Sequence, residues 1–476
     1  MSGKSSGTAA ITRRAFLAGA ASTAGAALLA ACGGSGSSST ATPAATSAVS
    51  ATGAAPAGSP TRAAGSVTVG ATTAASSAPT VATSGAKVSG SVSMWVYPLL
   101  GEDQSKNESL WSGIVKDFTT QNPGVKVDVQ VLPWANRDDK LTTALAGNKG
   151  PDVCYINEDQ IAQHVEAGTM TPLDDYLSAE ERNDYLQNAL ASATYKGKLY
   201  TAPILLTSTT IVYNTKLFKD AGVDTYPTTW DELIQVAPKF KEKGLFATSY
   251  TGALDQSLNL SYYPLLWQAD GKILNDDGTA AFNSPQGLDA LTFVTKLFSE
   301  GYTDKNEAIT RPAEGQSNLD LSKAATGLTI DNSGAQRLAK EWGTGVTKIG
   351  APLKNKKQIS YGTVAGFGLF SSQKSKDASV AWIRYLTSPT VAKQIILPGS
   401  YFPTKKSIGA LYGSDPILGE FEKILPMMRG GQLHPKARQV ISTLAPEIQA
   451  SFLGKKSPQQ ALADGEKAVN SLIKQG

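Results

Sequence analysis

The sequence predicts an α/β fold in which helices cover the faces of a parallel sheet. Segments with strand character lie at 91–96, 125–131 and 153–156, and the second of them alternates apolar and polar residues with period two. Between them, residues 109–120 and 138–146 place apolar side chains at helical spacing. Strand and helix therefore alternate as β-α-β-α-β, an order that favours parallel strands joined by helical crossovers.

Further elements are expected along the rest of the chain. Residues 209–213 read as a strand, and Thr228 or Thr229 can cap a helix whose first turn contains Asp231 and Glu232. Later amphipathic stretches lie at 286–299, 377–386, 389–397, 435–452 and 458–474. A chain of 476 residues is too long for one ordinary core, so two domains are expected.

The net charge of +4 does not indicate a nucleic-acid partner. Residues 1–89 hold five of the 44 Lys and Arg residues and none of the 40 acids, so residues 90–476 sum to −1. Two cysteines, Cys32 and Cys154, exclude a disulfide framework and a Cys-rich zinc site. Cys154 lies within an apolar strand and is expected to be a buried, inert thiol. The only histidines, His164 and His434, leave little for His-based chemistry.

The first 31 residues have the pattern of a secretory signal. Arg13 and Arg14 precede Phe-Leu and a weakly apolar, Ala-rich run that extends to residue 31. The Arg pair resembles twin-arginine export signals, and Leu-Ala-Ala-Cys at 29–32 resembles the bacterial lipobox. The resemblance implies a twin-arginine-like lipoprotein signal peptide at 1–31, with Arg13 and Arg14 as recognition residues and Cys32 as the lipid anchor. An ordinary Ala-rich helix is the alternative interpretation.

Residues 32–89 are expected to form a lipidated, disordered linker. Of the 57 residues from 33 to 89, 50 are Gly, Ser, Thr, Ala or Pro, and none is aromatic. Such a segment buries too little apolar surface to offset its ordering entropy. A flexible chain of this length has a typical span of roughly 40 Å.

Six motifs follow one another through residues 90–476. They are PDV at 151–153, AGTMTPLDDY at 167–176, YKGKLYTAP at 195–203, YNTKLFKDAG at 213–222 with WDEL at 230–233, SKDA at 375–378 leading to WIRYLTSP at 382–389, and SPQQAL at 457–462. In this order they resemble the solute-binding proteins of bacterial ABC importers, and most closely carbohydrate-binding family 1, the maltose-binding-protein-like group. We expect these motifs to mark the fold and not to contact ligand.

The resemblance implies a two-lobed, type II periplasmic-binding-protein-like α/β fold with a hinge and an interlobe ligand cleft. Lobe 1 would comprise about 90–203 and 362–400, and lobe 2 about 208–355 and 404–476. The implied function is that of an extracytoplasmic lipoprotein, anchored to the outer face of the cell membrane, that captures a sugar or oligosaccharide and delivers it to an ABC permease and its ATPase. We expect a monomer that is not an enzyme and needs no cofactor, metal or nucleic acid.

Sugar sites combine aromatic rings, which stack on pyranose faces, with polar groups that satisfy hydroxyls. In the family these groups stand in loops after strand ends. Mapping those loops onto lobe 1 gives Tyr97, Trp134, Asn136, Asn157, Glu158 and Asp159. Asp159 matches a ligand-contacting Asp of the maltose-binding relative, and Thr207 falls in the hinge where that relative has Glu. Trp134 fits packing on the lobe surface equally well.

Lobe 2 and the later crossings supply the other candidates. These are Tyr262, Tyr263, Asp331, Asn332, Gly366, Phe367, Tyr401 and Arg429. One or two of the rings at 262–263 are expected to face the cleft, and Phe367 could stack on a sugar where Gly366 allows close backbone approach. Asp331 and Asn332 stand where relatives often carry Gly-Ser-Trp, so hydroxyl binding without stacking is expected there.

Three other classes of function were weighed against the sugar importer. A glycoside hydrolase would need an acid and nucleophile pair of carboxylates, and no recognisable pair, nucleophile elbow or phosphate loop occurs. A carbohydrate-binding surface adhesin would suit the linker, but it needs no closing cleft. The same fold binding a polyamine or a glycerophosphodiester stays open, although the near-neutral region 90–476 favours an uncharged solute.

Overall fold

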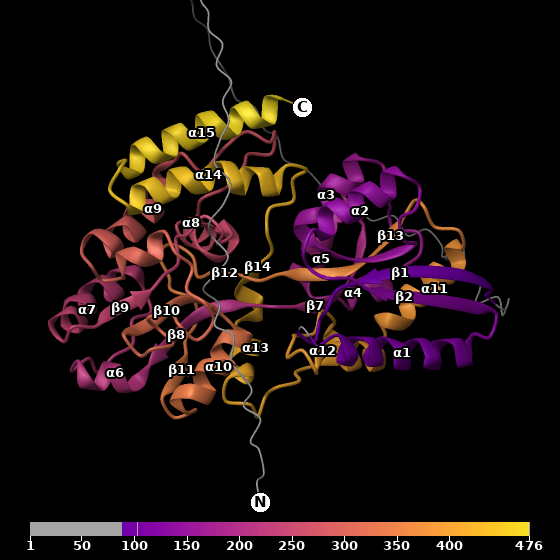
Figure 1. The fold of residues 1–476 in the computed structure, drawn as a ribbon, viewed down its shortest axis with the longest axis horizontal. Coiled ribbons are helices and arrows are strands. Elements are labelled where there is room, and N and C mark those ends of the chain that lie inside the picture. Colours follow the sequence, from indigo (N-terminus) through magenta and orange to yellow (C-terminus); the bar gives the residue numbers. More distant parts are fainter. Residues whose placement is uncertain (1–87, 102, 476) are drawn as a thin grey trace, which may run out of the picture. The chain divides into compact units, whose positions relative to one another are not determined.

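The computed structural model describes residues 88–101 and 103–475. The expected signal peptide, with Arg13 and Arg14, the lipidation residue Cys32 and nearly all of the expected linker therefore lie outside the described residues. Two separate sheets organise the described chain, and we call the sheet that begins with β1 and its helices lobe 1, and the sheet that begins with β8 and its helices lobe 2 (Figure 1).

The sheet of lobe 1 has six strands. They are β1 (Gly90–Val96), β2 (Val125–Val131), β3 (Val153–Asn157), β4 (Met170–Thr171), β7 (Thr201–Leu206) and β13 (Val364–Phe370). The order is β2-β1-β3-β13-β4, with β7 also paired to β13. Strand β1 runs parallel to β2 and β3, which confirms the predicted β-α-β-α-β unit, whereas β13 is antiparallel to its neighbours. A segment from late in the chain therefore lies in the middle of the first sheet.

Helices surround this sheet on both faces (Figure 1). They are α1 (Gln104–Gln121), α2 (Arg137–Ala146), α3 (Glu158–Glu166), α4 (Ala179–Asn183), α5 (Gln187–Ala193), α11 (Lys376–Leu386) and α12 (Pro389–Ile396), and a small hairpin pairs β5 (Thr194–Tyr195) with β6 (Lys198–Leu199). Helix α1 begins at the Asp103 cap, and its buried face includes Trp111, Ile114 and Phe118. Phe118 packs edge-to-face on Trp382 of α11, so sequence-distant helices share one core.

Lobe 2 has a four-stranded sheet with the order β11-β8-β10-β9. Its strands are β8 (Thr209–Asn214), β9 (Phe246–Ser249), β10 (Ala324–Asp331) and β11 (Thr347–Ile349). Its helices are α6 (Thr215–Asp220), α7 (Trp230–Glu242), α8 (Tyr262–Gln268), α9 (Pro285–Ser299), α10 (Asn332–Trp342), α13 (Leu418–Ile424), α14 (Ala437–Phe452) and α15 (Pro458–Lys474). The capping box at Thr229 and Glu232 starts α7, as the sequence predicts.

The chain passes between the two sheets three times, and the three crossings lie side by side. Thr207 N–H donates to Thr363 O and Thr363 N–H donates to Thr207 Oγ1, each at 3.0 Å. Leu206 and Phe402 exchange backbone hydrogen bonds of 2.9 and 3.0 Å. Strands β12 (Ser360–Tyr361) and β14 (Met428–Arg429) add a parallel pair beside them. These lateral hydrogen bonds make one continuous hinge from segments far apart in the sequence.

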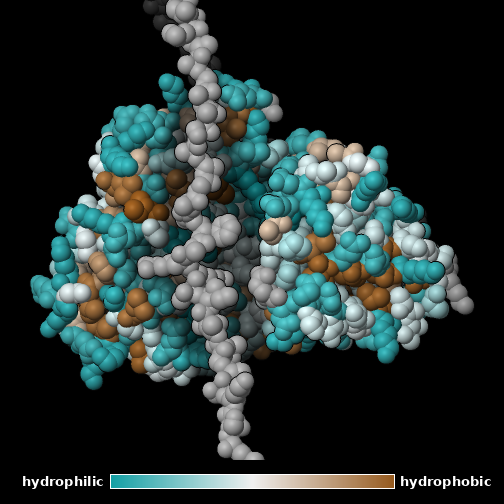
Figure 2. Space-filling view, viewed as in Figure 1, coloured by the Kyte–Doolittle hydropathy of each residue, from teal (hydrophilic) through white to brown (hydrophobic). Residues whose placement is uncertain are grey.

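An edge strand with half-buried valines marks the outer side of lobe 1. Strand β2 pairs only with β1 in the sheet order, and Val127, Val129 and Val131 on it stay partly exposed beside α1. Figure 2 shows the corresponding hydrophobic patch among hydrophilic residues. None of the helices within the described ranges is both long enough and apolar enough to cross a membrane.

Candidate binding cleft

Aromatic residues after β1 and β2 form a rigid group at the carboxyl edge of the lobe 1 sheet. Tyr97 is buried and stacks on Trp134 with ring centroids 5.0 Å apart. Trp134 stays partly exposed, and its indole Nε1 donates to Pro98 O at 3.2 Å. The Arg137 guanidinium lies 4.8 Å from the Trp134 ring centroid and 5.5 Å from that of Tyr97. Tyr97 therefore supports Trp134, which is the ring of this pair that a ligand can reach.

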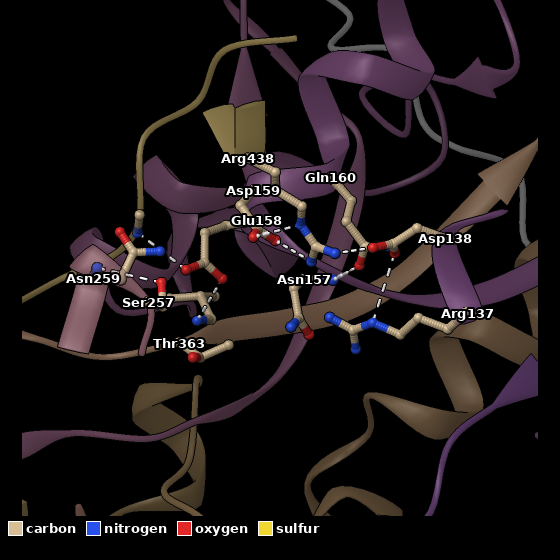
Figure 3. Close-up of polar contacts among 12 residues, drawn as sticks. Arg137, Asp138, Asn157, Glu158, Asp159, Gln160, Ser257, Asn259, Thr363 and Arg438 are labelled. Carbon is tan, nitrogen blue, oxygen red and sulfur yellow. Dashed lines mark hydrogen bonds and ion pairs between the residues drawn. The ribbon is translucent and has the colours of Figure 1, made fainter. Parts of the chain in front are cut away.

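The start of α3 brings Asn157, Glu158 and Asp159 into three different environments (Figure 3). Asn157 is the N-cap residue of α3, where its backbone N–H donates to Gln160 Oε1 at 3.1 Å, and its buried Oδ1 makes no hydrogen bond of normal geometry among the described residues. An unpartnered buried carbonyl is costly and invites a donor. Of the three predicted side chains, Asn157 is the one with binding capacity left over.

Glu158 is fully buried and accepts hydrogen bonds from two segments next to the hinge. Its Oε1 accepts the Gly431 N–H at 3.0 Å, and its Oε2 accepts the Val364 N–H at 3.0 Å. The Tyr361 hydroxyl lies 3.5 Å from Oε1. Burial, reinforced by the neighbouring Asp159 charge, raises the pKa of the Glu158 carboxyl well above its ordinary value. Glu158 was predicted to bind ligand by its position, and the structure instead gives it a bracing role between α3, β13 and the segment after β14.

Asp159 forms an ion pair that connects the two lobes. Arg438 of α14 holds it in a bidentate contact, with Nε–Oδ2 at 2.9 Å and Nη2–Oδ1 at 3.1 Å. Arg438 also pairs through Nη1 with Asp138 of α2, and Gln160 donates to the other oxygen of Asp138. One guanidinium from lobe 2 therefore holds two helix N-termini of lobe 1. Both carboxylate oxygens of Asp159, which the sequence predicts to contact ligand, already have a partner in Arg438.

The facing wall of lobe 2 contains Ser257 and Asn259, which sequence reasoning missed. Asn259 is 5% exposed, its backbone N–H is bonded to Ser257 Oγ, and its Oδ1 has no partner within the described part of the chain. Both residues lie close to Glu158 in Figure 3, on the opposite side from Asn157. A short 3₁₀ turn, Leu258–Leu260, positions them just before α8. The Ser-x-Asn pattern between β9 and α8 was the available sequence signal.

Asp331 and Asn332 lie at the end of β10, near the third crossing. Asp331 caps α10, accepting the Gly334 N–H at 2.7 Å and the Ser333 hydroxyl at 3.0 Å, and stays exposed. Asn332 is buried, and its Nδ2 donates to Ser400 O at 2.9 Å. The Asn332 side chain therefore holds the hinge segment at Ser400, whereas the Asp331 carboxylate remains accessible to solvent.

Three aromatic side chains that were predicted to contact ligand are instead buried in the cores of the lobes. Tyr262 and Tyr263 are 0% and 1% exposed, because all seven residues of α8 lie in the lobe 2 core. Phe367 is 0% exposed and packs edge-to-face on Trp111 and Tyr155 in the lobe 1 core. These rings are inaccessible to a ligand in the cleft, and their aromatic character serves packing.

The close packing of β13 against β7 explains why residue 366 is a glycine. A Cβ at Gly366 would lie 2.6 Å from Ala202 O, so glycine is required where β13 meets β7. This contact explains the residue without any approach of ligand to the backbone.

The remaining candidates occupy the hinge and its margins. Thr207 bonds Thr363 as described above, and the Tyr401 hydroxyl donates to Leu99 O at 3.0 Å. Asn136 adopts a left-handed conformation (φ 55°) before α2 and is exposed, and its side chain makes no capping hydrogen bond to that helix. The Arg429 guanidinium lies 4.8 Å from the Trp267 ring centroid.

Other reactive side chains are held in unreactive forms. Burial raises the pKa of Cys154 to about 12 and lowers that of His164 to about 4, so the thiol stays protonated and the imidazole neutral at pH 7. The described residues contain no group of three or more His, Cys, Asp or Glu side chains arranged to hold a metal ion.

Residues 102–393 match the family model described as bacterial extracellular solute-binding protein, and the chain belongs to this family. A binding protein of Brucella abortus (strain 2308) is 24% identical over 393 residues, which is 81% of this chain and 94% of that protein. The maltotriose-binding protein of Pyrococcus abyssi is 22% identical over 330 residues, covering 67% and 68% of the two chains.

The fold is that of the two-lobed periplasmic binding proteins. The crystal structure of the cyclic alpha-maltosyl-1,6-maltose binding protein from Arthrobacter globiformis matches with a TM-score of 0.72 and 20% identity, over 82% of this chain and all of that one. This match confirms the predicted architecture.

Proposed function

We propose that this protein captures a sugar or oligosaccharide between its lobes and delivers it to an ABC permease and its ATPase. The Pyrococcus and Arthrobacter proteins named above bind maltotriose and a cyclic maltosyl-maltose, which supports a carbohydrate ligand here. Capture by hinge closure would shift a population toward the closed form, since ligand gains contacts with both lobes at once.

One observation carries the proposal. Asn157 on lobe 1 and Asn259 on lobe 2 each hold a buried amide oxygen without a partner among the described residues, and Trp134, after β2 of lobe 1, is partly exposed. Hydroxyl groups can donate to both amide oxygens, and a pyranose face can stack on the indole. A sugar placed there would satisfy one orphaned group on each lobe.

The proposal also covers the part of the chain that precedes the solute-binding region. We infer that residues 1–31 direct export, with the twin-arginine motif at Arg13 and Arg14, and that Cys32 carries a lipid. The linker 32–89 would tether the solute-binding region 90–476 to the outer face of the cell membrane. Under the same proposal the protein acts as a monomer and catalyses no reaction.

A thermal-shift screen of the purified protein tests the ligand class. A bound ligand raises the melting temperature by mass action. We expect a shift of several degrees with one sugar class and none with spermidine or glycerophosphocholine, and we expect Asn157→Ala and Asn259→Ala each to reduce the sugar shift. A shift with a charged control alone would contradict the carbohydrate assignment and favour a different solute.

A further inference from the structure

An apolar cavity of about 560 Å³ lies beside the third crossing, between α5 of lobe 1 and the end of α13 of lobe 2. The segment 403–410, which follows the crossing, and the 3₁₀ turn Leu425–Met427 complete its walls. Ligand cavities in proteins span about 300–1,000 Å³, so this one has the capacity for a small molecule. The apolar residues of its lining are Leu186, Ala191, Pro403, Ala410, Leu425 and Pro426.

Hydrogen bonds between the walls hold the cavity in shape. The Leu186 N–H donates to Thr404 O at 2.8 Å, which fastens the segment 403–410 to the start of α5. The Asn188 Nδ2 donates to Leu425 O at 2.8 Å, which fastens α5 to the 3₁₀ turn. A site that is already formed loses little conformational entropy when a ligand enters it.

Two charged side chains of the lining are bound to other parts of the protein. The Glu422 carboxylate accepts the Leu411 N–H at 2.6 Å and the Tyr412 N–H at 2.9 Å. The Lys406 Nζ donates to Asn183 O at 2.6 Å. Neither side chain therefore needs a further partner from a molecule in the cavity.

Lys405 differs from these two because its charge has no direct partner. Lys405 lines the cavity and is only 9% exposed, and its ammonium makes no hydrogen bond or ion pair within the described ranges. The Nζ lies 4.9 Å from the Tyr185 ring centroid. Burial lowers the pKa of Lys405. The nearest acids, Asp184 and Glu181, attract it from farther away and already bond other groups.

These features select the chemistry of a ligand. A sugar would leave its hydroxyls unpaired against the apolar walls, which is costly. A neutral apolar molecule would leave the Lys405 ammonium without an anion, and a cationic one would meet like charge. A molecule with an aliphatic chain and one carboxylate satisfies both the walls and the ammonium.

We infer that this cavity binds an aliphatic carboxylate of the medium-chain fatty acid class, with the chain against the apolar walls and the carboxylate at Lys405. The cavity shares no lining residue with the group formed by Trp134, Asn157 and Asn259. The inference therefore adds a second ligand class at a second site and does not depend on the proposed function.

Calorimetric titration of the purified protein tests the inference, with decanoate as the probe. We expect saturable binding of one decanoate per protein molecule. Acetate, which lacks the chain, should not bind, and decyltrimethylammonium should bind at least about tenfold more weakly, because it carries the opposite charge.

Two pairs of variants locate the binding. Lys405→Met removes the charge, keeps an apolar stem and should weaken decanoate binding at least about tenfold. Lys455→Met is the matched control, since Lys455 is exposed outside the cavity lining, and it should bind within about twofold of the unchanged protein. Ala191→Phe should fill part of the cavity and abolish binding, whereas Ala191→Ser should keep it, because Ala191 lines the cavity and is exposed.

The contrary results are equally specific. An absence of saturable decanoate binding, equal affinity for decyltrimethylammonium, or decanoate affinity that survives either Lys405→Met or Ala191→Phe overturns the assignment. If Ala191→Phe fails to fold by circular dichroism, Ala410→Phe replaces it with the same expected loss. Sugar binding is tested separately through Asn157→Ala and Asn259→Ala, so failure of one proposal leaves the other standing.

Discussion

Replacing Glu158 with alanine should destabilise the whole solute-binding region. The substitution leaves the Gly431 and Val364 N–H groups without their acceptor, at 3.0 Å from an oxygen in each case. An unsatisfied buried donor costs about 1–3 kcal/mol, so two cost about 2–6 kcal/mol. Unfolding roughly 390 residues at about 2.1 cal/mol/K each gives an entropy near 0.8 kcal/mol/K, and the melting temperature should fall by about 2–7 °C.

Calorimetry of the ligand-free protein measures this effect. Glu166→Ala provides the matched control, because Glu166 ends the same helix and lies at the surface, where it pairs with Lys196 and bonds the Tyr195 side chain. Such pairs are worth about 0–1 kcal/mol, so the control should melt close to the unchanged protein. A Glu158→Ala variant that melts within about 1 °C of the control would refute the bracing role.

The pH dependence provides a second measurement on the same residue. A carboxyl whose folded pKa is raised contributes stability that is fully present below its unfolded pKa and is lost as pH rises through the folded value. Stability should therefore fall from about pH 5 to about pH 9, and Glu158→Gln, which does not ionise, should reduce that slope. An unchanged slope in the Gln variant would show that another group is responsible.

Three further substitutions separate packing from binding. Arg438→Met removes the ion pairs that join α14 to Asp159 and Asp138, so we expect a more open ligand-free form by small-angle scattering and at least several-fold weaker sugar binding; an unchanged scattering profile would contradict the interlobe role. Phe367→Ala should cost about 3–5 kcal/mol by denaturant titration, because it leaves a core cavity, and a variant of unchanged stability that binds weakly would restore the stacking role. Trp134→Ala should show the opposite pattern, lowering affinity with little change in stability, as checked by calorimetry and melting.

The sequence-based predictions succeeded where the pattern is local. The strand predicted at 125–131 is confirmed as Val125–Val131, and the helix predicted at 138–146 is confirmed as Arg137–Ala146. Helix α1 begins at Gln104, after the Asp103 cap, which is earlier than the predicted start at 109. The prediction missed the first turn because its residues are polar and show no apolar periodicity.

Side-chain direction was harder to predict than element type. The aromatic cluster at 262–267 predicts one or two rings facing the cleft, but all seven residues of the helix that it forms are buried, so neither Tyr262 nor Tyr263 is exposed to a ligand. Phe367 lies on a central strand whose two faces are both covered, and a central strand has no solvent face to offer.

Long-range partners carry no signal in a single sequence. The ion pair of Arg438 and Asp159 spans 279 residues, and an arginine on an amphipathic helix is ordinarily interpreted as a surface residue. Resemblance made Asp159 a candidate ligand contact, but it could not reveal the guanidinium that holds it. Asn259 was missed although the Ser-x-Asn pattern precedes α8, because its unpartnered, buried Oδ1 is visible only in the structure.

The central position of β13 has a consequence for how the protein is made. Strand β3 pairs with β13 along Val153–Asn157, so the first sheet stays incomplete until residue 370 has left the ribosome. During that interval β3 exposes an unpaired edge, a feature that favours aggregation and slow folding through distant contacts. Folding of lobe 1 must therefore follow synthesis of most of the chain, and a truncation before residue 364 should yield insoluble protein.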